Sequence, residues 1–440
     1  MRIFLFLLTV CLAGCQIPLS PPRSPELAPE IRHTLPPTDD QVVGRLGRLR
    51  LRSGDTLADV ARHFGIGFQA IQDANPGVDP WLPTPGTEIL LPLAFILPDA
   101  THQGIVINLA AMRLFYFPAP HSSRVWSYAV GIGRDGWNTP LGQTRIIEKK
   151  TNPRWVVPES IRREHARKGD PLPKVVPPGP DNPLGRHALR LGWPSYLIHG
   201  TNKPYGVGLR VSHGCIRLYP EDIAELFPEI DVGTPVTVVN QPYLAGWRDG
   251  QVFVQIYRPL DQKGATLKKL WHDLEKRLKA HESRTGKPID WQRVERAVAD
   301  ARGIPLPVLQ SSPPWNRYLA QVPRIPHPGT WPGKFVPPPP RPGWYVKVEM
   351  PLPETTAEKL VAMLHHQGPP LPAHRIGNRI LIGPYPDEHQ AKRTETRLAR
   401  DLELTGRLLS PRQSQRFFRS RFNKPEKPSR NGYRLRNPPK

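Results

Sequence analysis

The sequence predicts a mainly β domain, a sandwich of β-sheet, flanked by small α+β modules. Short runs of β-branched and aromatic residues, separated by turn residues, fill positions 104–239. Segments that mix strand and helix periodicity stand on either side, at 47–93 and 343–410. The chain has 57 prolines in 440 residues, well above the usual share of about 5%, so we expect separate modules joined by Pro-rich segments.

The composition excludes several classes of protein. Hydrophobic residues make up 38% of the chain, which is enough to build cores and excludes wholesale disorder. The apolar stretch Ile3–Leu12 is shorter than the roughly 20 residues that span a bilayer, and a polytopic membrane protein is excluded. The 61 Lys+Arg against 38 Asp+Glu give a net charge of +23, which suits a polyanionic partner.

The first residues have the pattern of an export signal. An apolar run after Arg2 ends in Leu12-Ala13-Gly14-Cys15, which resembles the bacterial lipobox. The resemblance implies that residues 1–14 are removed and that Cys15 carries a lipid anchor in the periplasm. Gln16, rather than Asp, favours the outer membrane where the host has two. The alternative is an ordinary signal peptide with an accidental cysteine, and because the protein is exported we expect no nucleic-acid partner.

The cysteine count singles out one thiol. The chain has three cysteines, Cys11, Cys15 and Cys215. Processing would remove the first and acylate the second, which leaves Cys215 in an oxidising compartment with no partner in its own chain. Such a thiol either has no function or takes part in the chemistry of the protein.

The N-terminal part predicts a tether and a small module. Residues 15–46 are rich in Pro, Ser and charge and predict the tether. Residues 47–93 predict strand, helix, helix and strand, with Asp55 as the cap of the first helix. The module resembles LysM in Gly54-Asp55-Thr56-Leu57, Ala74-Asn75-Pro76 and Ile89-Leu90-Leu91-Pro92. This resemblance implies binding of glycan that contains N-acetylglucosamine; the alternative is a spacer domain.

The part after residue 242 predicts three further segments. Helical stripes indicate an extension with helices at 243–310, and eleven prolines indicate a semi-rigid linker at 311–342. Strands and helices at 343–410, with the run Ile382-Gly383-Pro384-Tyr385, resemble a SPOR domain. That resemblance implies recognition of septal peptidoglycan strands stripped of stem peptides; the alternative is an unrelated α+β module. Residues 411–440 carry ten Lys+Arg and one acid and predict a disordered basic tail.

Two short runs carry the candidate chemistry. A cysteine is an effective nucleophile only as the thiolate, and a nearby imidazole can take its proton and later return it to a leaving group. His199 ends an apolar run and Cys215 follows a tight turn, so two adjacent strands would bring them together. Gly214 lets backbone N–H groups approach an oxyanion, and Arg217 adds a charge that could hold a carboxylate or support the thiolate. The runs are Tyr196-Leu197-Ile198-His199-Gly200-Thr201 and Ser212-His213-Gly214-Cys215-Ile216-Arg217-Leu218.

Two alternatives stay open from the residues alone. Most cysteines are buried structural residues, but a His-Gly before the cysteine and a second histidine upstream are unusual for a core strand. Cys215 with His199 and His213 could instead supply three protein ligands to a zinc ion.

The two runs resemble the YkuD-type L,D-transpeptidases, whose signature is an upstream His-Gly and a downstream Ser-His-Gly-Cys with Arg or Asn two residues on. Matches to the ErfK/YbiS/YcfS/YnhG-like subgroup continue at 104–108, 152–155, 181–185 and 198–202. The resemblance implies a catalytic domain at 99–242 that needs no cofactor and no metal. The Pro-dense insertion at 152–183 predicts a flap.

The same resemblance implies roles for the residues of the runs. Cys215 would be the nucleophile and His199 the proton acceptor and donor, oriented by the carbonyl of Gly200. The further assignments are the amides of His213, Gly214 and Cys215 as an oxyanion hole, the His213 ring beside the thiol, and Gly200, Ser212 and Arg217 as substrate contacts.

The implied reaction is acyl transfer on the tetrapeptide stem of peptidoglycan. Cys215 would attack the carbonyl at the L-centre of the diamino acid and release D-Ala, and an amine would resolve the thioester. A second stem gives a 3→3 cross-link, a lysine of an outer-membrane lipoprotein ties that protein to the wall, and water gives carboxypeptidase activity. Two other functions stay open, a peptidoglycan-binding scaffold with an idle catalytic domain and a zinc-dependent wall hydrolase.

Overall fold

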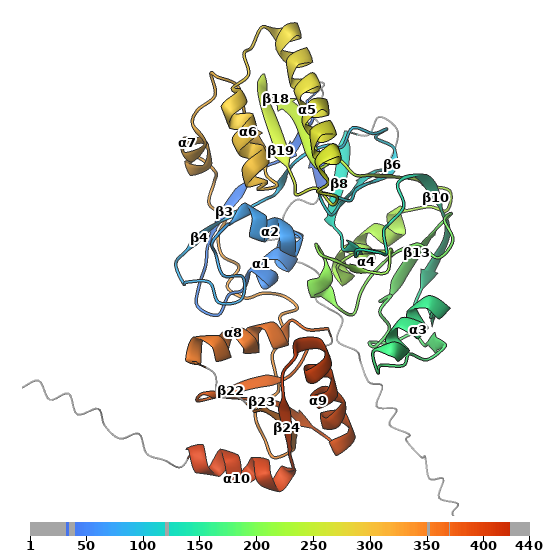
Figure 1. The fold of residues 1–440 in the computed structure, drawn as a ribbon, viewed down its shortest axis with the longest axis vertical. Helices are drawn as coiled ribbons and strands as arrows, with labels where there is room; N and C mark the ends of the chain where they lie inside the picture. The colour runs from blue at the N-terminus through green and yellow to red at the C-terminus, as the bar shows by residue number, and fades with distance from the viewer. Residues whose placement is uncertain (1–31, 35–39, 119–122, 350–352, 369, 423–440) are drawn as a thin grey trace, which may run out of the picture.

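The computed structural model describes residues 32–34, 40–118, 123–349, 353–368 and 370–422. Figure 1 shows a small blue module in the middle, a large green β domain beside it, a yellow extension above and an orange to red C-terminal module below. Within these described ranges, no helix combines the length and the apolar character needed to cross a membrane. The predicted signal peptide and Cys15 lie outside the described residues.

The small module has the predicted order of strand, helix, helix and strand. Strands β3 (Gly47–Arg50) and β4 (Glu88–Leu91) pair antiparallel, and helices α1 (Leu57–His63) and α2 (Phe68–Ala74) lie between them in the chain. The predicted cap of α1 was wrong. Thr56 is the N-cap and accepts from the Asp59 amide at 3.1 Å, because Asp55 turns back to accept from the Arg52 amide at 2.6 Å.

A nine-stranded sheet dominates the large domain, in the spatial order β1-β8-β7-β6-β17-β10-β13-β14-β16. The β-branched strands β6 and β17 are parallel neighbours in its middle, where both faces are covered. In chain order the strands are β1 (Arg32–Thr34), β6 (Gly104–Asn108), β7 (Arg113–Phe117), β8 (Arg124–Ala129), β10 (Gly142–Thr151), β13 (His187–Leu191), β14 (Leu197–His199), β16 (Ile216–Arg217) and β17 (Pro235–Val239).

The large sheet folds over at β10. The first half of β10 pairs with β17 and the second half with β13, with a register shift between Ile146 and Glu148 that bends the strand. One core receives side chains from both parts and from helix α4 (Pro220–Glu229). The predicted mainly β sandwich is therefore confirmed, and it consists of one curled sheet. The shared core includes Ile105, Leu114, Ile146, Leu189, Ile198, Ile223 and Val236.

The end of the predicted tether is folded, which corrects the boundary at residue 46. Strand β1 adds to the edge of the large sheet beside β8, and β2 (Val42–Gly44) pairs with β5 (Ala94–Ile96). His33 is buried and hydrogen-bonds Ser127 at 2.9 Å. These strands have only three residues each, too few for a periodic signal to stand out from Pro-rich surroundings.

The Pro-dense insertion forms a lobe of the large domain, in which α3 (Glu159–Arg167) is labelled below β13 (Figure 1). Strands β11 (Trp155–Val156) and β12 (Val175–Val176) pair, and helix α3 lies between them in the chain. The buried Asn182 ties the base of the lobe together by donating to the Pro153 carbonyl at 2.8 Å.

The two helical stripes after the large domain form α5 (Gly264–Thr285) and α6 (Trp291–Asp300). They pack on a three-stranded sheet of β18 (Tyr243–Arg248), β19 (Gln251–Ile256) and β20 (Leu306–Pro307). The core takes Leu274 and Leu278 from α5 and Val294 and Ala297 from α6, whereas Leu267 and Leu270 of the predicted first stripe lie outside it.

The C-terminal module is a split βαβ fold in which all strand pairs are antiparallel. Its spatial strand order is β22-β23-β21-β24. The elements are β21 (Trp344–Val348), α8 (Glu354–His365), β22 (Ala373–Ile376), β23 (Arg379–Tyr385), α9 (Glu388–Leu402) and β24 (Gly406–Leu409).

The prediction of disorder is wrong for residues 411–422. Helix α10 (Pro411–Phe422) packs on the sheet of the C-terminal module, where Phe417 and Phe418 lie against a cluster that includes Tyr345. The basic composition predicted disorder, whereas these two aromatic residues anchor the helix to the module. Residues 423–440 lie outside the described part of the chain.

The Pro-rich segment at 311–342 packs on the small module, which corrects its prediction as a spacer. It contains helix α7 (Trp315–Ala320), and its Ile325 amide donates to the Arg48 carbonyl at 2.8 Å. Trp331 is buried in the core of the small module, and its indole N–H donates to Asp55 at 2.8 Å. The segment therefore completes the small module's core.

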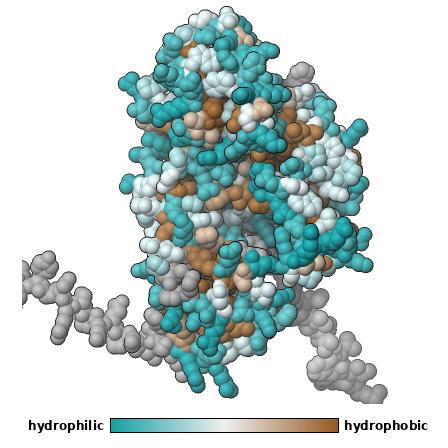
Figure 2. Space-filling model, in the orientation of Figure 1, coloured by the Kyte–Doolittle hydropathy of each residue, from teal (hydrophilic) through white to brown (hydrophobic). Residues whose placement is uncertain are grey.

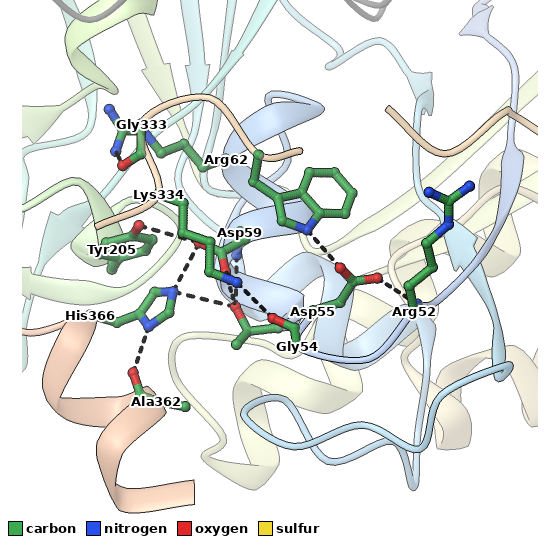
Figure 3. Close-up of polar contacts among 12 residues, drawn as sticks. Arg52, Gly54, Asp55, Asp59, Arg62, Tyr205, Gly333, Lys334, Ala362 and His366 are labelled. Carbon is green, nitrogen blue, oxygen red and sulfur yellow. Dashed lines mark hydrogen bonds and ion pairs between the residues drawn. The ribbon is translucent and has the colours of Figure 1, made fainter. Parts of the chain in front are cut away.

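A buried polar cluster joins the C-terminal module to the small module (Figure 3). Asp59 lies 3.0 Å from His366 Nε2 and 3.4 Å from Lys334 Nζ, and it accepts from the Tyr205 hydroxyl at 3.4 Å. On the face in Figure 2, hydrophilic residues dominate and hydrophobic ones gather in smaller patches along the middle. Between the modules, one apolar cluster joins Leu46 and Leu90 to Leu306 and Val322.

Candidate active site

The predicted residues meet in one cavity at the edge of the large sheet. The cavity has a volume of about 460 Å³ and is walled by the insertion on one side and by the two motif runs on the other. Gly200 and Gly214 are not among the residues that line it, and each directly adjoins one that does, His199 and Cys215. The motif side chains in the wall are His199, Ser212, His213, Cys215 and Arg217.

Strand register places the thiol and the imidazole on one face. Strands β14 and β16 are parallel neighbours, with Ile198 beside Ile216 and His199 beside Arg217. Cys215 precedes β16 by one residue and therefore falls beside Leu197. Because side chains alternate between the faces of a sheet, Cys215 and His199 lie on the same face and diagonal to each other. The predicted pairing of two adjacent strands is confirmed.

His199 is held as a neutral base. Its Nδ1 lies 2.5 Å from the Gly200 carbonyl, so the Nδ1–H tautomer donates there and Nε2 is left with its lone pair. The ring is buried, with 3% of its surface exposed. This burial, together with the Arg217 charge, lowers the pKa of His199 to about 3. The predicted orientation by Gly200 agrees with this contact.

The thiol of Cys215 is also neutral at rest. Burial raises its pKa above the ordinary value, and Arg217 opposes that rise. The Sγ–H donates to the Ser195 carbonyl at 3.6 Å, and Ser195 has a left-handed φ of 68°. Sequence reasoning missed Ser195; the Gly-Trp-Pro run before it is the signal of a turn.

The side-chain hydroxyl of Ser212 fixes the turn from Ser212 to Cys215. Ser212 Oγ donates to the Cys215 carbonyl at 2.6 Å and accepts from the Gly214 amide at 3.1 Å. The predicted oxyanion role of the Gly214 amide is therefore corrected, because this amide already donates inside the turn. The hydroxyl of Ser212, expected to contact substrate, is likewise used within the turn. The amides of His213 and Cys215 are the two candidates left from the predicted set.

Gly214 and Arg217 have clear geometric roles. Gly214 has a φ of 102°, and an added Cβ would come within 2.8 Å of the Tyr196 ring, so glycine is required there. The Arg217 guanidinium is largely buried, and its Nε has no hydrogen-bond partner in the described structure. Arg217 also lines the cavity, so its positive charge lies at the cavity wall.

His213 belongs to a network that sequence reasoning missed. Its Nε2 lies 3.2 Å from Glu164 of α3 and 3.1 Å from Arg134, which follows the short strand β9 (Ile132–Gly133). The Trp137 ring packs edge-on against it with centroids 4.8 Å apart. No pattern in the sequence links the insertion to a loop 30 residues earlier.

The zinc alternative requires three clustered ligands. Among the described residues no group of three or more His, Cys, Asp and Glu side chains is arranged to hold a metal ion. His199 and His213, which were the two histidine ligands of that alternative, instead hydrogen-bond the Gly200 carbonyl and Glu164.

Comparison with known proteins matches the two main regions of the chain. Residues 102–238 match the family model of the L,D-transpeptidase catalytic domain, YkuD, and residues 50–92 match that of the LysM domain. The probable L,D-transpeptidase YbiS of Escherichia coli (strain K12) is 38% identical over 284 residues, which cover 63% of this chain and 92% of YbiS. The chain belongs to the L,D-transpeptidase family.

One further relative and one solved structure are also similar to the chain. The probable L,D-transpeptidase YcfS of Escherichia coli (strain K12) is 41% identical over 236 residues, covering 52% of this chain and 73% of YcfS. Among solved structures, the catalytic domain of an E. faecium L,D-transpeptidase is 21% identical with a TM-score of 0.24, covering 32% of this chain and 99% of that domain.

Family membership identifies the chain as an L,D-transpeptidase, an enzyme of acyl transfer. The transpeptidase and LysM domains together indicate peptidoglycan as the polymer with which it works. The C-terminal module and the Pro-rich segment lie beyond the matched ranges.

Proposed function

We propose that this L,D-transpeptidase transfers the acyl group of a tetrapeptide stem to an amine through a thioester on Cys215. The observation that carries the proposal is the placement of Cys215 and His199 on one face of the sheet edge, in the wall of one cavity. The Gly200 carbonyl supports His199 as the base by fixing its tautomer.

The first half-reaction forms the thioester. As Cys215 Sγ attacks the carbonyl at the L-centre of the diamino acid, His199 Nε2 takes the thiol proton. The proton then passes to the nitrogen of the leaving D-Ala as the C–N bond breaks. Because the thiol and imidazole are both neutral at rest, proton transfer accompanies the attack and does not precede it.

The second half-reaction releases the acyl group. An acceptor amine attacks the thioester, loses a proton to His199, and the Cys215 thiolate leaves and is reprotonated. The acceptor is a stem side chain in a 3→3 cross-link or a lysine of an outer-membrane lipoprotein; water as acceptor would give hydrolysis. Arg217 supports this scheme, because it lines the cavity, where its positive charge suits a substrate carboxylate and favours the departing thiolate.

Covalent labelling tests the nucleophile and the base. A carbapenem should form a one-to-one adduct with the wild-type chain at Cys215, seen as an increase in mass. Cys215→Ala should give no adduct. His199→Gln should slow labelling by about 100-fold or more, since general-base catalysis supplies roughly that factor. The matched control is His187→Gln, a half-buried histidine on the adjacent strand β13, which should label at the wild-type rate. Unchanged labelling of His199→Gln would refute the assigned base.

Wall chemistry distinguishes the enzyme from an idle scaffold. Sacculi from cells that carry Cys215→Ala should lose the 3→3 cross-linked or lipoprotein-linked muropeptides that wild-type cells contain. The masses of the linked muropeptides also identify the acceptor. Identical muropeptides in both strains would favour the scaffold.

We further propose a lipid anchor at Cys15 in the outer membrane, facing the periplasm. The lipobox-like run before Cys15 supports this. Cys15→Ser should move the protein from the membrane fraction to the periplasmic fraction. A variant that stays with the outer membrane would contradict the anchor.

The two non-catalytic modules are proposed to hold the enzyme on glycan. The LysM match supports binding of N-acetylglucosamine-containing strands, and the split βαβ topology supports a SPOR-like module that recognises stem-free strands at the septum. Deleting residues 343–422 should disperse a septal fluorescent signal, and an undisturbed septal signal would exclude the SPOR-like role.

A further inference from the structure

We infer that Glu164 of the insertion is a positioning residue for acyl transfer, because it ties helix α3 to the catalytic turn through His213 and Arg134. The inference rests on the proposed role of Cys215 as the nucleophile. Glu164 lies outside both motif runs and does not touch the thiol in the described structure. It would therefore act through the residues that shape the turn.

Three side chains, those of Arg134, Lys168 and His213, contact the carboxylate of Glu164. Its two oxygens accept from Arg134 at 2.6 Å, Oε1 accepts from Lys168 at 2.7 Å, and Oε2 lies 3.2 Å from His213 Nε2. Hydrogen bonds from Arg134 and Lys168 lower the pKa of Glu164 to about 2, so the carboxylate is ionised at any pH at which the enzyme works.

The partners of Glu164 are themselves fixed to the turn. The Arg134 amide donates to the Ser212 carbonyl at 3.0 Å, and Thr139 Oγ1 donates to the Gly214 carbonyl at 2.8 Å. His213, the residue that Glu164 contacts directly, lies two positions before Cys215 in the chain. A shift of α3 would therefore be transmitted to the amides of His213 and Cys215, the two oxyanion candidates.

The contact between Glu164 and the turn also affects the residues of α3 that line the cavity. Pro158, Ser160 and Ile161, at the start of α3, line the cavity opposite the motif runs. Glu164 is one helical turn beyond Ser160, on the same helix. One carboxylate thus fixes both the position of the insertion and the orientation of the turn, and misplacement of reacting groups by about 1 Å can cost roughly 100-fold in rate.

The test measures carbapenem acylation of the full chain over a range of carbapenem concentrations. Glu164→Gln removes the charge and keeps the size of the side chain. We expect the saturating acylation rate to fall about 10-fold, the half-saturating concentration to change less than two-fold, and labelling to reach one equivalent per chain. A loss of folded protein would lower the final extent of labelling instead. Saturating rates within two-fold of wild type would overturn the inference.

Two further variants make the result specific. Glu159→Gln is the matched control on the same helix, because Glu159 is exposed and its ion pairs in the described residues are with Arg162 and Arg163 of α3. It should acylate at the wild-type rate, and an equal slowing of both variants would contradict the inference. Arg134→Met removes the arginine that contacts both Glu164 and His213, and it should slow acylation about as much as Glu164→Gln does.

The experiment separates this inference from the proposed function. If wild-type protein gives no adduct at Cys215, the nucleophile itself is refuted. If the wild type is labelled and Glu164→Gln is labelled equally fast, only the positioning role is refuted.

Discussion

At the scale of single residues, the site keeps a thiol and an imidazole uncharged beside a buried arginine. Burial lowers the pKa of His199 and raises that of Cys215, and the Arg217 charge adds to the first shift and opposes the second. The arginine therefore makes the base weaker and the thiolate easier to form. Such a balance suits a nucleophile that is activated only during attack.

This balance predicts the pH dependence of thiol alkylation. The rate of iodoacetamide reaction at Cys215 should still be rising at pH 9, because the raised pKa keeps the thiolate scarce below that point. Arg217→Met should slow the reaction at pH 8, since it removes the charge that favours the thiolate. Arg190→Gln, an exposed arginine at the rim of the cavity, is the control and should react as wild type. A plateau below pH 7 would contradict the neutral thiol.

Two buried histidines predict loss of stability in acid. His199 has a pKa of about 3, and burial together with Arg113 lowers the pKa of His33 to about 4, against 6.5 in the unfolded chain. The unfolded state therefore binds more protons below pH 6.5, so the free energy of unfolding falls from there toward pH 4. Urea unfolding should show a loss of about 2 kcal/mol or more from pH 7 to pH 5, since each pKa unit is worth about 1.4 kcal/mol. His33→Asn should flatten this dependence, and equal slopes in both proteins would exclude His33 as a contributor.

At the scale of elements, the small module is incomplete without a segment that lies more than 200 residues later. Trp331 lies in its core, and the Trp331 indole satisfies Asp55, so the Pro-rich segment replaces contacts that a free-standing module would have to make by itself. The prolines reduce the conformational freedom that the segment loses on docking.

Trp331→Ala should therefore destabilise the small module. We expect the free energy of unfolding to fall by about 3–5 kcal/mol, from the lost packing and the lost hydrogen bond to Asp55. Limited proteolysis should then cut within the Pro-rich segment. The control is Val336→Ala, because Val336 is 79% exposed in the same segment and should change stability by less than about 0.5 kcal/mol. Equal stability of both variants would show that Trp331 packing contributes little.

At the scale of the whole molecule, the Asp59 cluster holds the C-terminal module against the small module. Asp59 contacts His366 of the C-terminal module, Lys334 of the Pro-rich segment and Tyr205 of the large domain (Figure 3). A second contact links Arg400 of α9 to Asp170, just after the insertion helix, at 3.1 Å. The C-terminal module is thus connected to both of the other functional parts.

Removing the histidine of this cluster should release the C-terminal module. His366→Ala leaves Asp59 buried with one fewer partner, which costs about 1–3 kcal/mol. We expect the radius of gyration from small-angle scattering to increase, while the rate of carbapenem acylation stays within two-fold of wild type. The control is His389→Ala, an exposed histidine of α9, which should leave the radius unchanged. An unchanged radius in His366→Ala would mean that other contacts hold the module.

What the sequence could predict depends on the distance between interacting residues. The helices of the small module, the two motif runs and the pairing of His199 with Cys215 follow from local periodicity and from adjacent strands. The Glu164–His213 contact, the burial of Trp331 and the three-residue β1 depend on partners 49, 276 and about 90 positions away in the chain. The use of the Ser212 hydroxyl inside its turn depends on backbone dihedral angles that the residue types alone do not specify.

The position of β1 has a mechanical consequence. This strand forms one edge of the nine-stranded sheet, and β16, which adjoins the nucleophile, forms the other. Tension applied through the chain before Arg32 would first open the three residue pairs between β1 and β8, one after another. Strand β8 itself leads through Val130 to Gly131, whose amide donates to the Arg217 carbonyl at 2.8 Å, two residues after Cys215. Loss of β1 would therefore uncover the edge of the strand that leads directly to the reaction centre.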